Sequence, residues 1–319
     1  MLMPTSSSYS DLQKMEENHD QSITLAVCSN RMENIRRHVG DYINSLCNGD
    51  NLFIVLDLEE DTNAKSFRAE LNHTGAKIFI NGENLGLSAS RNIVLERCRT
   101  NYLVFIDDDI ALSKETIDAI RHELKMGADI VGVRINGPKI ELKIPWYISK
   151  GQFHYLAIHN PKARTLSTWG ACMGLNLSLV KTSNLTFRVE LGRRGRGLQS
   201  GDDTTFLREM KKRGAKETFL NEIYVFHNID SQRMSLGYML RRAYWQGRSE
   251  FRRKDSINGL KKEWNRFLDT DEPASKKAAL AILYSTCVIT GLSREILGLC
   301  KGNLVRAATS FLAGHRNLE

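Results

Sequence analysis

Two aspartates, two positions apart, follow directly after the apolar run 102–106. Side chains of an extended chain alternate between its two sides, so Asp107 and Asp109 project in the same direction. Such a carboxylate pair suits Mg²⁺ or Mn²⁺, which is typically held by one or two carboxylates while substrate phosphates and water complete its shell. The spacing predicts a divalent cation site that would bind a diphosphate; the alternative is an acidic cap opening the next helix.

The chain from residue 23 to residue 106 alternates short apolar runs with segments of helical periodicity, four times in succession. This alternation predicts a mainly parallel, Rossmann-like α/β sheet with helices on both faces. Ligands of such sheets bind beyond the carboxyl ends of the strands, which is where the two aspartates stand. The predicted strands are 23–27, 52–56, 77–80 and 102–106, and the predicted helices are 31–46, 64–72 and 88–99.

Beyond Ile110 the alternation is less regular. We expect helices over 114–126 and 201–213, and strands over 129–134 and 222–226. From Ser235 the pattern is helical, with a break near 269–273 where Pro273 cannot continue a helix. The predicted organisation is a loose tail at 1–20, an α/β domain at 21–230 with halves 21–110 and 111–230, and a helical region at 231–319.

The composition is that of an ordinary globular protein, with 41% hydrophobic and 26% charged residues among 319. These values exclude a disordered or collagen-like chain. The six cysteines are scattered without a Cys-x-x-Cys pair, so we expect neither a zinc site nor a disulfide framework, and a reducing compartment is the simplest interpretation. Residues 1–20 lack the apolar core of a signal peptide. We therefore expect a cytoplasmic protein.

The net charge of +8 is concentrated in one segment. Residues 231–262 contain nine Lys or Arg and two Asp or Glu, and aromatic residues are interleaved among them. Such a segment suits a diphosphate, a polyanion or an anionic membrane surface; the alternative is a solvated helix face. The aromatic residues are Tyr238, Tyr244, Trp245 and Phe251.

An uncharged stretch of 16 residues, 278–293, lies further along the helical region. It is shorter than the roughly 20 apolar residues that span a bilayer. We expect a buried helix here; the alternative is a helix on a membrane surface, which would make the protein peripheral at the inner face of the membrane.

A series of motifs in a fixed order resembles the nucleotide-sugar-binding half of the GT-A glycosyltransferases, specifically the large inverting family 2. A later segment, Gly201-Asp202-Asp203-Thr204-Thr205-Phe206-Leu207-Arg208, is similar to that family's Gly-Glu-Asp-x-x-(apolar)-x-x-Arg segment. The resemblance covers roughly 22–230. The earlier motifs are Cys28-Ser29-Asn30, Asp57, Asn84-x-Gly86-x-x-x-Ser90-Arg91-Asn92 and Ile106-Asp107-Asp108-Asp109.

The resemblance implies a GT-A fold with a C-terminal helical appendage, and it assigns donor-binding roles. Asp57 would bind the nucleotide base and Arg91 would lie near the nucleotide; the alternatives are a strand-ending Asp57 and an Arg91 paired with Glu96 on a helix surface. Asp109 would be the direct ligand of Mn²⁺ or Mg²⁺. The remaining implied donor-side residues are Cys28 and Asn30 in the base pocket, Asp107 and Asp108 of the acidic motif, and Asp107 and His227 at the metal. The charge of segment 231–262, apart from the resemblance, predicts that Arg242 and Arg248 face the donor diphosphate or an anionic acceptor.

The same resemblance implies the catalytic and acceptor residues. Asp203 would be the general base that takes the proton of the acceptor hydroxyl, with Asp202 as the second candidate; the alternative is that both acids only favour the start of the helix. Trp169, next to Gly170, is a candidate acceptor platform because an indole face packs on a sugar; the alternative is a core residue.

These features predict a metal-dependent inverting glycosyltransferase that uses a nucleotide-diphosphate sugar, with UDP as the family's commonest nucleotide, and a glycan, lipid-linked or small-molecule acceptor. A processive synthase is not expected because Gln246-Gly247-Arg248 lacks the Gln-x-x-Arg-Trp motif. A sugar nucleotidyltransferase is the alternative enzyme, but no Gly-rich cationic loop follows the first strand. A nucleic-acid-binding protein would leave the acids of 107–109 without a role, so we expect no nucleic acid partner.

Overall fold

The computed structural model describes residues 22–138, 143–161, 166–254, 256–268 and 272–315; the predicted tail lies outside these ranges. The chain forms two compact units. The first comprises residues 1–143, 156–196 and 201–230, and the second comprises 144–155, 197–200 and 231–319. The second unit therefore contains two short segments from within the predicted α/β domain as well as the C-terminal helical region.

The first unit is built on an eight-stranded sheet in the order β3-β2-β1-β4-β7-β6-β8-β5. Strands β3, β2, β1 and β4 are parallel, as predicted. The second half is mixed, because β7 is antiparallel to both β4 and β6 while β6 and β8 are parallel. The strands are β1 Ile23–Ser29, β2 Asn51–Glu59, β3 Lys77–Gly82, β4 Tyr102–Ile106, β5 Ile110–Ala111, β6 Ile130–Asn136, β7 Cys172–Asn176 and β8 Glu217–His227.

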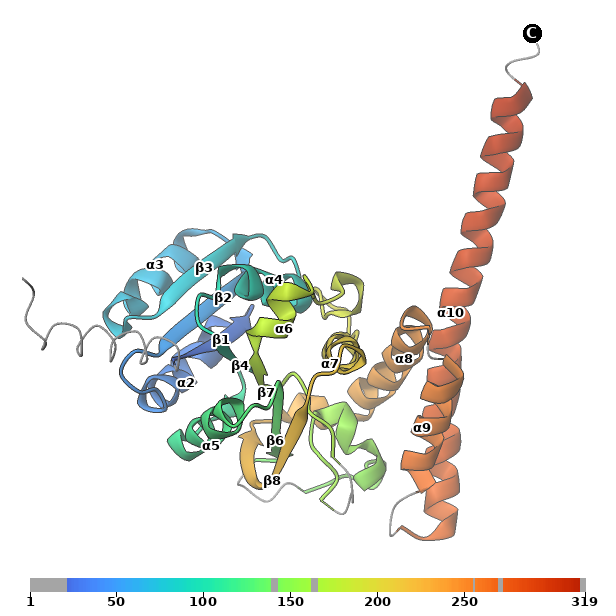
Figure 1. Ribbon diagram of the computed structural model, residues 1–319. Helices are drawn as coiled ribbons and strands as arrows, with labels where there is room; N and C mark the ends of the chain where they lie inside the picture. The colour runs from blue at the N-terminus through green and yellow to red at the C-terminus, as the bar shows by residue number, and fades with distance from the viewer. Residues whose placement is uncertain (1–21, 139–142, 162–165, 255, 269–271, 316–319) are drawn as a thin grey trace, which may run out of the picture. The chain divides into compact units, whose positions relative to one another are not determined.

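Helices cover both faces of this sheet (Figure 1). Side chains of α2 (Met32–Asn44), α3 (Thr62–Leu71) and α5 (Lys114–Lys125) join one buried apolar cluster, which includes Ile35, Phe67 and Ile120. Side chains of α4 (Leu87–Arg97), α6 (Leu177–Thr182) and α7 (Asp202–Lys212) join a second cluster, which includes Val94 and Phe206. The α/β prediction is confirmed.

The register of the parallel strands brings separate polar segments together. Val27 of β1 pairs with Ile106 of β4, so the residues that follow each strand emerge side by side at one edge of the sheet. At the same edge β5 pairs with the end of β8, and Ile110 lies opposite His227. The segments 28–31, 107–109 and 227–228 therefore meet although they are far apart in the sequence.

The second unit contains α8 (Leu236–Arg252), α9 (Ser256–Leu268) and α10 (Ala274–His315), which pack on one another (Figure 1). Glycines allow α8 and α10 to approach closely. A Cβ added at Gly247 would lie 1.8 Å from the carbonyl oxygen of Val288, and one added at Gly291 would lie 1.9 Å from that of Tyr244. Larger residues at either glycine would force the two helices apart.

A buried acid ties α9 to the segment 144–155 of the same unit. The carboxylate of Glu263 accepts hydrogen bonds from the Tyr155 hydroxyl at 2.9 Å and contacts His154 Nε2 at 3.0 Å and Arg266 Nη1 at 2.6 Å. Burial alone would raise the pKa of Glu263, but these three partners hold it well below its usual range.

Candidate active site

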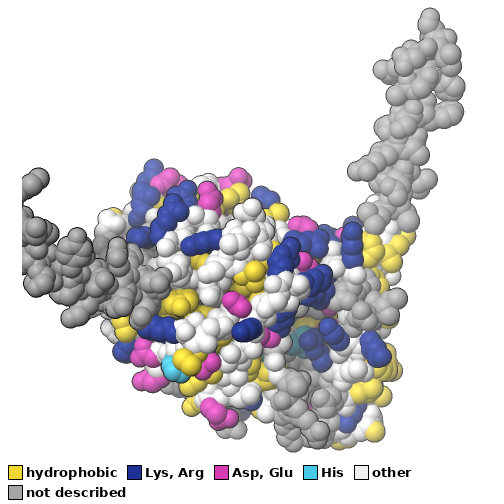
Figure 2. All heavy atoms as spheres, in the orientation of Figure 1, with side chains coloured by type: hydrophobic (Ala, Val, Ile, Leu, Met, Phe, Trp, Pro, Cys, Tyr) yellow, Lys and Arg dark blue, Asp and Glu magenta, His cyan; other side chains and the backbone are white. Residues whose placement is uncertain are grey.

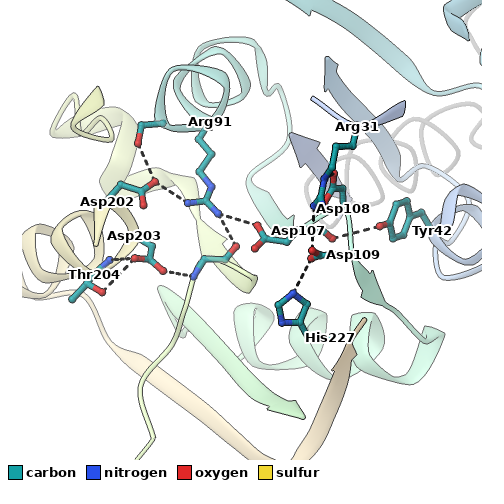
Figure 3. A network of polar contacts seen from close by, with 12 residues as sticks. Arg31, Tyr42, Arg91, Asp107, Asp108, Asp109, Asp202, Asp203, Thr204 and His227 are labelled. Atoms are coloured by element: carbon teal, nitrogen blue, oxygen red, sulfur yellow. Dashed lines mark hydrogen bonds and ion pairs between the residues drawn. The ribbon is translucent and has the colours of Figure 1, made fainter. Parts of the chain in front are cut away.

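The acidic segment 107–109 forms a tight turn between β4 and β5, in which the amide of Ile110 donates to the carbonyl of Asp107 at 3.2 Å. Asp108 and Asp109 are buried, whereas the side chain of Asp107 is 32% exposed. The three carboxylates therefore stand at the carboxyl end of a central strand, where the sequence predicted them (Figure 3).

Arg31 neutralises two of these carboxylates. Its Nη2 lies 2.5 Å from Asp108 Oδ1 and 3.2 Å from Asp109 Oδ2, while the hydroxyl of Ser29 donates to the other oxygen of Asp108. Arg31 precedes the first turn of α2, and its side chain is 43% exposed. A guanidinium thus bridges Asp109 of the predicted cation site and the neighbouring Asp108 (Figure 3).

His227 reaches the same group of acids from β8. Its Nε2 lies 3.1 Å from Asp109 Oδ1, and the amide of the next residue, Asn228, donates to the Asp109 carbonyl at 2.8 Å. The imidazole is almost fully buried. The structure therefore brings His227 and Asp109 together, as the resemblance implied.

Arg91 joins the acidic turn to the second predicted acidic pair. This buried guanidinium contacts Asp202 Oδ2 at 2.9 Å, Asp107 Oδ1 at 3.3 Å and the carbonyl oxygen of Gly170 at 2.9 Å. Burial opposes its charge, but Asp202 and Asp107 hold the pKa of Arg91 above its usual value. The alternative of a surface pair with Glu96 is wrong, because this face of α4 packs toward the acids.

Asp202 and Asp203 start α7 but have different surroundings. Asp202 is buried and accepts hydrogen bonds from Arg91 and from the Ser88 hydroxyl at 3.0 Å. Asp203 is partly exposed and accepts the amide protons of Gly170 at 2.7 Å and Thr204 at 2.6 Å. The carboxylate of Asp203 is therefore fixed in position while keeping access to solvent (Figure 3).

Burial and mutual repulsion weaken two of these acids. Burial raises the pKa of Asp107 to about 6, with Arg91 opposing the shift and the charges of Asp109 and Asp108 adding to it. Burial also raises the pKa of Asp202, against the attraction of Arg91. Perturbed acids gathered at one strand edge are typical of functional sites.

Residues of the predicted base pocket lie at the ends of β1 and β2. Asp57 is buried, and its carboxylate accepts hydrogen bonds from the amides of Leu85 at 2.7 Å and Gly86 at 2.9 Å and from the Asn81 amide at 2.7 Å. The carboxylate fastens the loop between β3 and α4. Cys28 is buried, and burial raises the pKa of its thiol to about 12, whereas Asn30 is exposed.

The predicted acceptor residues lie next to Asp203. Gly170 donates its amide to Asp203 and gives its carbonyl to Arg91, and a Cβ at this position would lie 2.7 Å from Arg91 Nη2. The ring of Trp169 is half-buried and lies on His159 with ring centres 4.0 Å apart. One face of the indole is therefore covered.

Arg248 and Arg242 belong to the second unit and have partners there. Arg248 Nε contacts Glu295, and its guanidinium lies 4.3 Å from the centre of the Trp245 ring. The buried Arg242 lies over the Tyr155 ring and donates to Gln246 at 3.2 Å. A contact of either arginine with a donor diphosphate stays a prediction.

Arg31, Ser29 and Ser88 were not among the predicted site residues. Arg31 and Ser29 are the neighbours of Asn30 at the end of the first strand, so their position in the sequence could have identified them as site residues. Ser88 lies three residues before Arg91 on α4, a spacing that puts both side chains on one face of a helix. Their partners lie 77 to 114 positions away, which no local pattern reveals.

The chemistry of the acidic turn fits a divalent cation that takes much of its shell from a substrate. Within the described ranges, no group of three His, Cys, Asp or Glu side chains is placed to hold a metal ion by itself. Asp107 and Asp109 would supply the one or two carboxylates that Mg²⁺ or Mn²⁺ uses together with substrate phosphates.

The acidic residues of this site lie beyond the carboxyl ends of parallel strands, which is where α/β sheets bind their ligands. The family model of glycosyl transferase family 2 matches residues 26–183, which include β1, β4 and the acidic turn. The chain belongs to this family and is a glycosyltransferase with the GT-A fold, so the resemblance and the enzyme class are confirmed.

A curated relative and two solved structures show the same likeness. The succinoglycan biosynthesis protein ExoM of Rhizobium meliloti (strain 1021) is 23% identical over 193 residues, 59% of this chain and 60% of that protein's length. The structure of S. aureus TarS 1–349 in complex with UDP-GlcNAc has a TM-score of 0.51 and 15% identity, covering 82% of this chain and 70% of that one. The mannosyltransferase PcManGT of Pyrobaculum calidifontis, in complex with GDP-Man and Mn²⁺, has a TM-score of 0.52 and 14% identity, covering 91% and 80%.

Proposed function

We propose that this enzyme transfers a sugar from a nucleotide-diphosphate donor to an acceptor hydroxyl with inversion, with Asp203 as the general base. The observation that carries the proposal is the way Gly170 connects two acids. Its amide holds Asp203, and its carbonyl holds Arg91, which also contacts Asp107 at the strand end. A candidate base and the candidate donor site are thereby fixed relative to each other within one unit.

The reaction is a single displacement. The acceptor oxygen forms a bond to the anomeric carbon while the bond from that carbon to the diphosphate oxygen breaks, and the diphosphate leaves with the electron pair. The hydroxyl proton passes to Asp203. Because one attack occurs from the face opposite the leaving group, the anomeric configuration inverts and no covalent enzyme intermediate forms.

The different surroundings of the two acids favour Asp203 over Asp202 as the base. The Oδ2 atom of Asp202 is held by Arg91 and Ser88 inside the protein, so a proton there would break an ion pair. Asp203 is partly exposed, and hydrogen bonds from two backbone amides fix its carboxylate without neutralising the charge. A fixed and accessible carboxylate suits proton transfer in the transition state.

Asp107 and Asp109, with His227 behind Asp109, are the residues that would hold a Mn²⁺ or Mg²⁺ ion. When bound there, the ion supplies positive charge that stabilises the departing diphosphate. Asp108 has a different role in this proposal: its contacts with Ser29 and Arg31 join the ends of β1 and β4. That junction positions the end of β1, where Cys28 and Asn30 line the proposed base pocket together with Asp57.

UDP is the nucleotide we propose, because it is the commonest in the family and TarS is known in complex with UDP-GlcNAc. The mannosyltransferase structure, with GDP-Man, marks GDP as the alternative. The name of the curated relative, a succinoglycan biosynthesis protein, favours a glycan or lipid-linked glycan as acceptor. Trp169, half-buried beside Gly170, is the residue that we propose as the platform for that sugar.

We place the enzyme in a reducing compartment, the cytoplasm. Cys28, Cys98 and Cys172 are buried free thiols, so the fold of the first unit requires no disulfide between them. Buried thiols of this kind behave as small apolar side chains.

The test combines ligand binding with product analysis. UDP should raise the melting temperature more in the presence of Mn²⁺ than in its absence, and Asp109→Asn should remove that cation-dependent increment. Asp118→Asn is the matched control, because Asp118 is an exposed acid of α5 that pairs with Lys114. An equal increment in Asp109→Asn and wild type would refute the cation site.

Turnover of a panel of nucleotide sugars should release a nucleoside diphosphate, and NMR of the product should show the inverted anomer. Release of pyrophosphate would indicate a nucleotidyltransferase instead. A retained anomer would refute the single displacement.

A further inference from the structure

Helix α10 has one face buried inside the second unit. Leu280, Ala281, Tyr284 and Val288 are almost fully buried, and Gly291 meets α8 at backbone contact distance. This spacing of three to four residues marks one stripe of a helix. The expectation of a buried helix over 278–293 therefore holds for this stripe only.

The opposite face of α10, which we call the outer face, is apolar and exposed. Ile282 is 65% exposed, Ile289 is 51% exposed and Leu297 is 60% exposed. Ile282, Ile289 and Ile296 recur every seven residues, which keeps them on one side of the helix. The other exposed residues between 278 and 297 that belong to the outer face are Ala278, Ala279, Thr286, Thr290 and Ser293.

The two threonine hydroxyls of the outer face donate within the helix. The hydroxyl of Thr286 donates to the carbonyl of Ile282 at 2.8 Å, and that of Thr290 donates to the carbonyl of Thr286 at 2.8 Å. Such bonds to the preceding turn satisfy the hydroxyl donors without an outside partner.

The same unit carries exposed cations. Lys261 and Lys262 on α9, and Arg294 on α10, are exposed and have no acidic partner among the residues that the structure describes. Exposed Trp264 and Leu268 lie on α9. Figure 2 shows Lys and Arg side chains next to hydrophobic ones along the edge of the view where α9 and α10 lie. An apolar face bordered by cations is the pattern of helices that bind anionic membrane surfaces.

The length of α10 would permit a membrane span, but its packing opposes one. Residues 274–298 are long and apolar enough to cross a bilayer, and 28% of that window is buried in the protein. The buried stripe, however, binds α8, whose Arg248 and Arg252 hold Glu295, and Tyr284 donates to the Tyr147 carbonyl at 2.8 Å. A span would carry these charged and polar groups into hydrocarbon.

We propose that the outer face of α10 docks on the surface of an anionic lipid bilayer, with the helix lying in the plane of the headgroups. Isoleucines and Leu297 enter the boundary of the acyl chains, while Lys261, Lys262 and Arg294 contact lipid phosphates. Such docking would hold the enzyme at the surface that carries lipid-linked acceptors. Docking on the bilayer requires neither the donor site nor turnover. A negative result for docking is therefore distinct from a negative result for the proposed sugar transfer.

The test is flotation of the full chain with vesicles of phosphatidylcholine alone or with 30% phosphatidylglycerol. We expect binding to the anionic vesicles at 50 mM NaCl, at least tenfold weaker binding at 500 mM because charges are screened, and little binding to neutral vesicles. Ile282→Glu with Ile289→Glu should weaken binding to the anionic vesicles at least tenfold. Lys261→Glu with Lys262→Glu should also weaken it and should flatten the salt dependence.

The matched control is Met126→Glu with Val189→Glu, which replaces two exposed apolar residues of the first unit by the same acids. It should bind vesicles as wild type does, and circular dichroism and melting temperature should show that all variants are folded. Wild-type protein that ignores anionic vesicles at low salt would overturn the proposal. So would a dimer in solution that Ile282→Glu with Ile289→Glu dissociates without any change in vesicle binding, because a second copy would then cover the outer face.

Discussion

Arg31 pairs with Asp109, one of the two carboxylates that we propose to hold a divalent cation. Its guanidinium also contacts the neighbouring Asp108. An incoming cation must compete with these ion pairs for Asp109. Replacing Arg31 with Met, which keeps a long unbranched side chain without the charge, should therefore tighten the binding of Mn²⁺ alone.

The magnitude follows from the exposure of the arginine. Because its side chain is 43% exposed, each ion pair is screened by solvent and contributes about 0.2–1 kcal/mol. Loss of both ion pairs removes about 0.4–2 kcal/mol of competition, which corresponds to a roughly twofold to thirtyfold lower dissociation constant for Mn²⁺. Stronger repulsion between the bared carboxylates acts in the same direction.

The assay is titration of Mn²⁺ into nucleotide-free protein, with free Mn²⁺ followed by electron paramagnetic resonance. The matched control is Arg36→Met, since Arg36 lies on the same helix but pairs with Glu33 and Glu70. The control should bind Mn²⁺ as wild type does. Equal or weaker binding by a folded Arg31→Met variant would refute the competition, and absence of binding in both proteins would refute the cation site itself.

Three further outcomes follow from particular contacts. Asp203→Asn should keep UDP affinity and lose transfer by roughly 10²–10⁴-fold, measured as nucleoside diphosphate release, because it removes the general base; transfer near the wild-type rate would exclude Asp203. Asp57→Asn should lower the free energy of unfolding by about 1–3 kcal/mol in urea, because a donor replaces an acceptor beside two amides; an unchanged value would contradict its loop-fastening role. The ionised Glu263 stabilises the fold at pH values above about 4.3, the pKa of this carboxyl in the unfolded chain, and this contribution is lost as pH falls. The difference in unfolding free energy between wild type and Glu263→Gln should therefore shrink below pH 4. A difference that does not depend on pH would contradict this role of Glu263.

The first half of the α/β domain could be predicted because its strands are continuous apolar runs. Strand β1 is buried at every position, and the helices that follow carry regular apolar stripes. The second half was harder to interpret. β7 contains Gly174 between apolar residues, and β8 is half-exposed along most of its length, so its predicted span of 222–226 covers only part of Glu217–His227. Antiparallel insertion of β7 between β4 and β6 leaves no local signal.

The candidate site also has a part that could be predicted from the sequence and a part that could not. Asp107, Asp109 and Asp203 carried recognisable motifs, but the arginines that hold these segments together did not. Arg31 meets Asp108 only because β1 and β4 are neighbours with Val27 opposite Ile106. Likewise, the uncharged stretch of the sequence ends at Arg294, whereas α10 continues beyond it because Arg and Glu are favourable residues in a helix. Glu295 pairs there with Arg248 and Arg252.

Gly170 explains why the candidate base and the acidic turn can act together. Its backbone is held on one side by Arg91, which contacts both Asp107 and Asp202, and on the other by Asp203. Any side chain at this position would press on the guanidinium, so absence of a Cβ is what lets one peptide segment contact both groups. One arginine and one peptide therefore connect Asp107 of the acidic turn to Asp203, the proposed base.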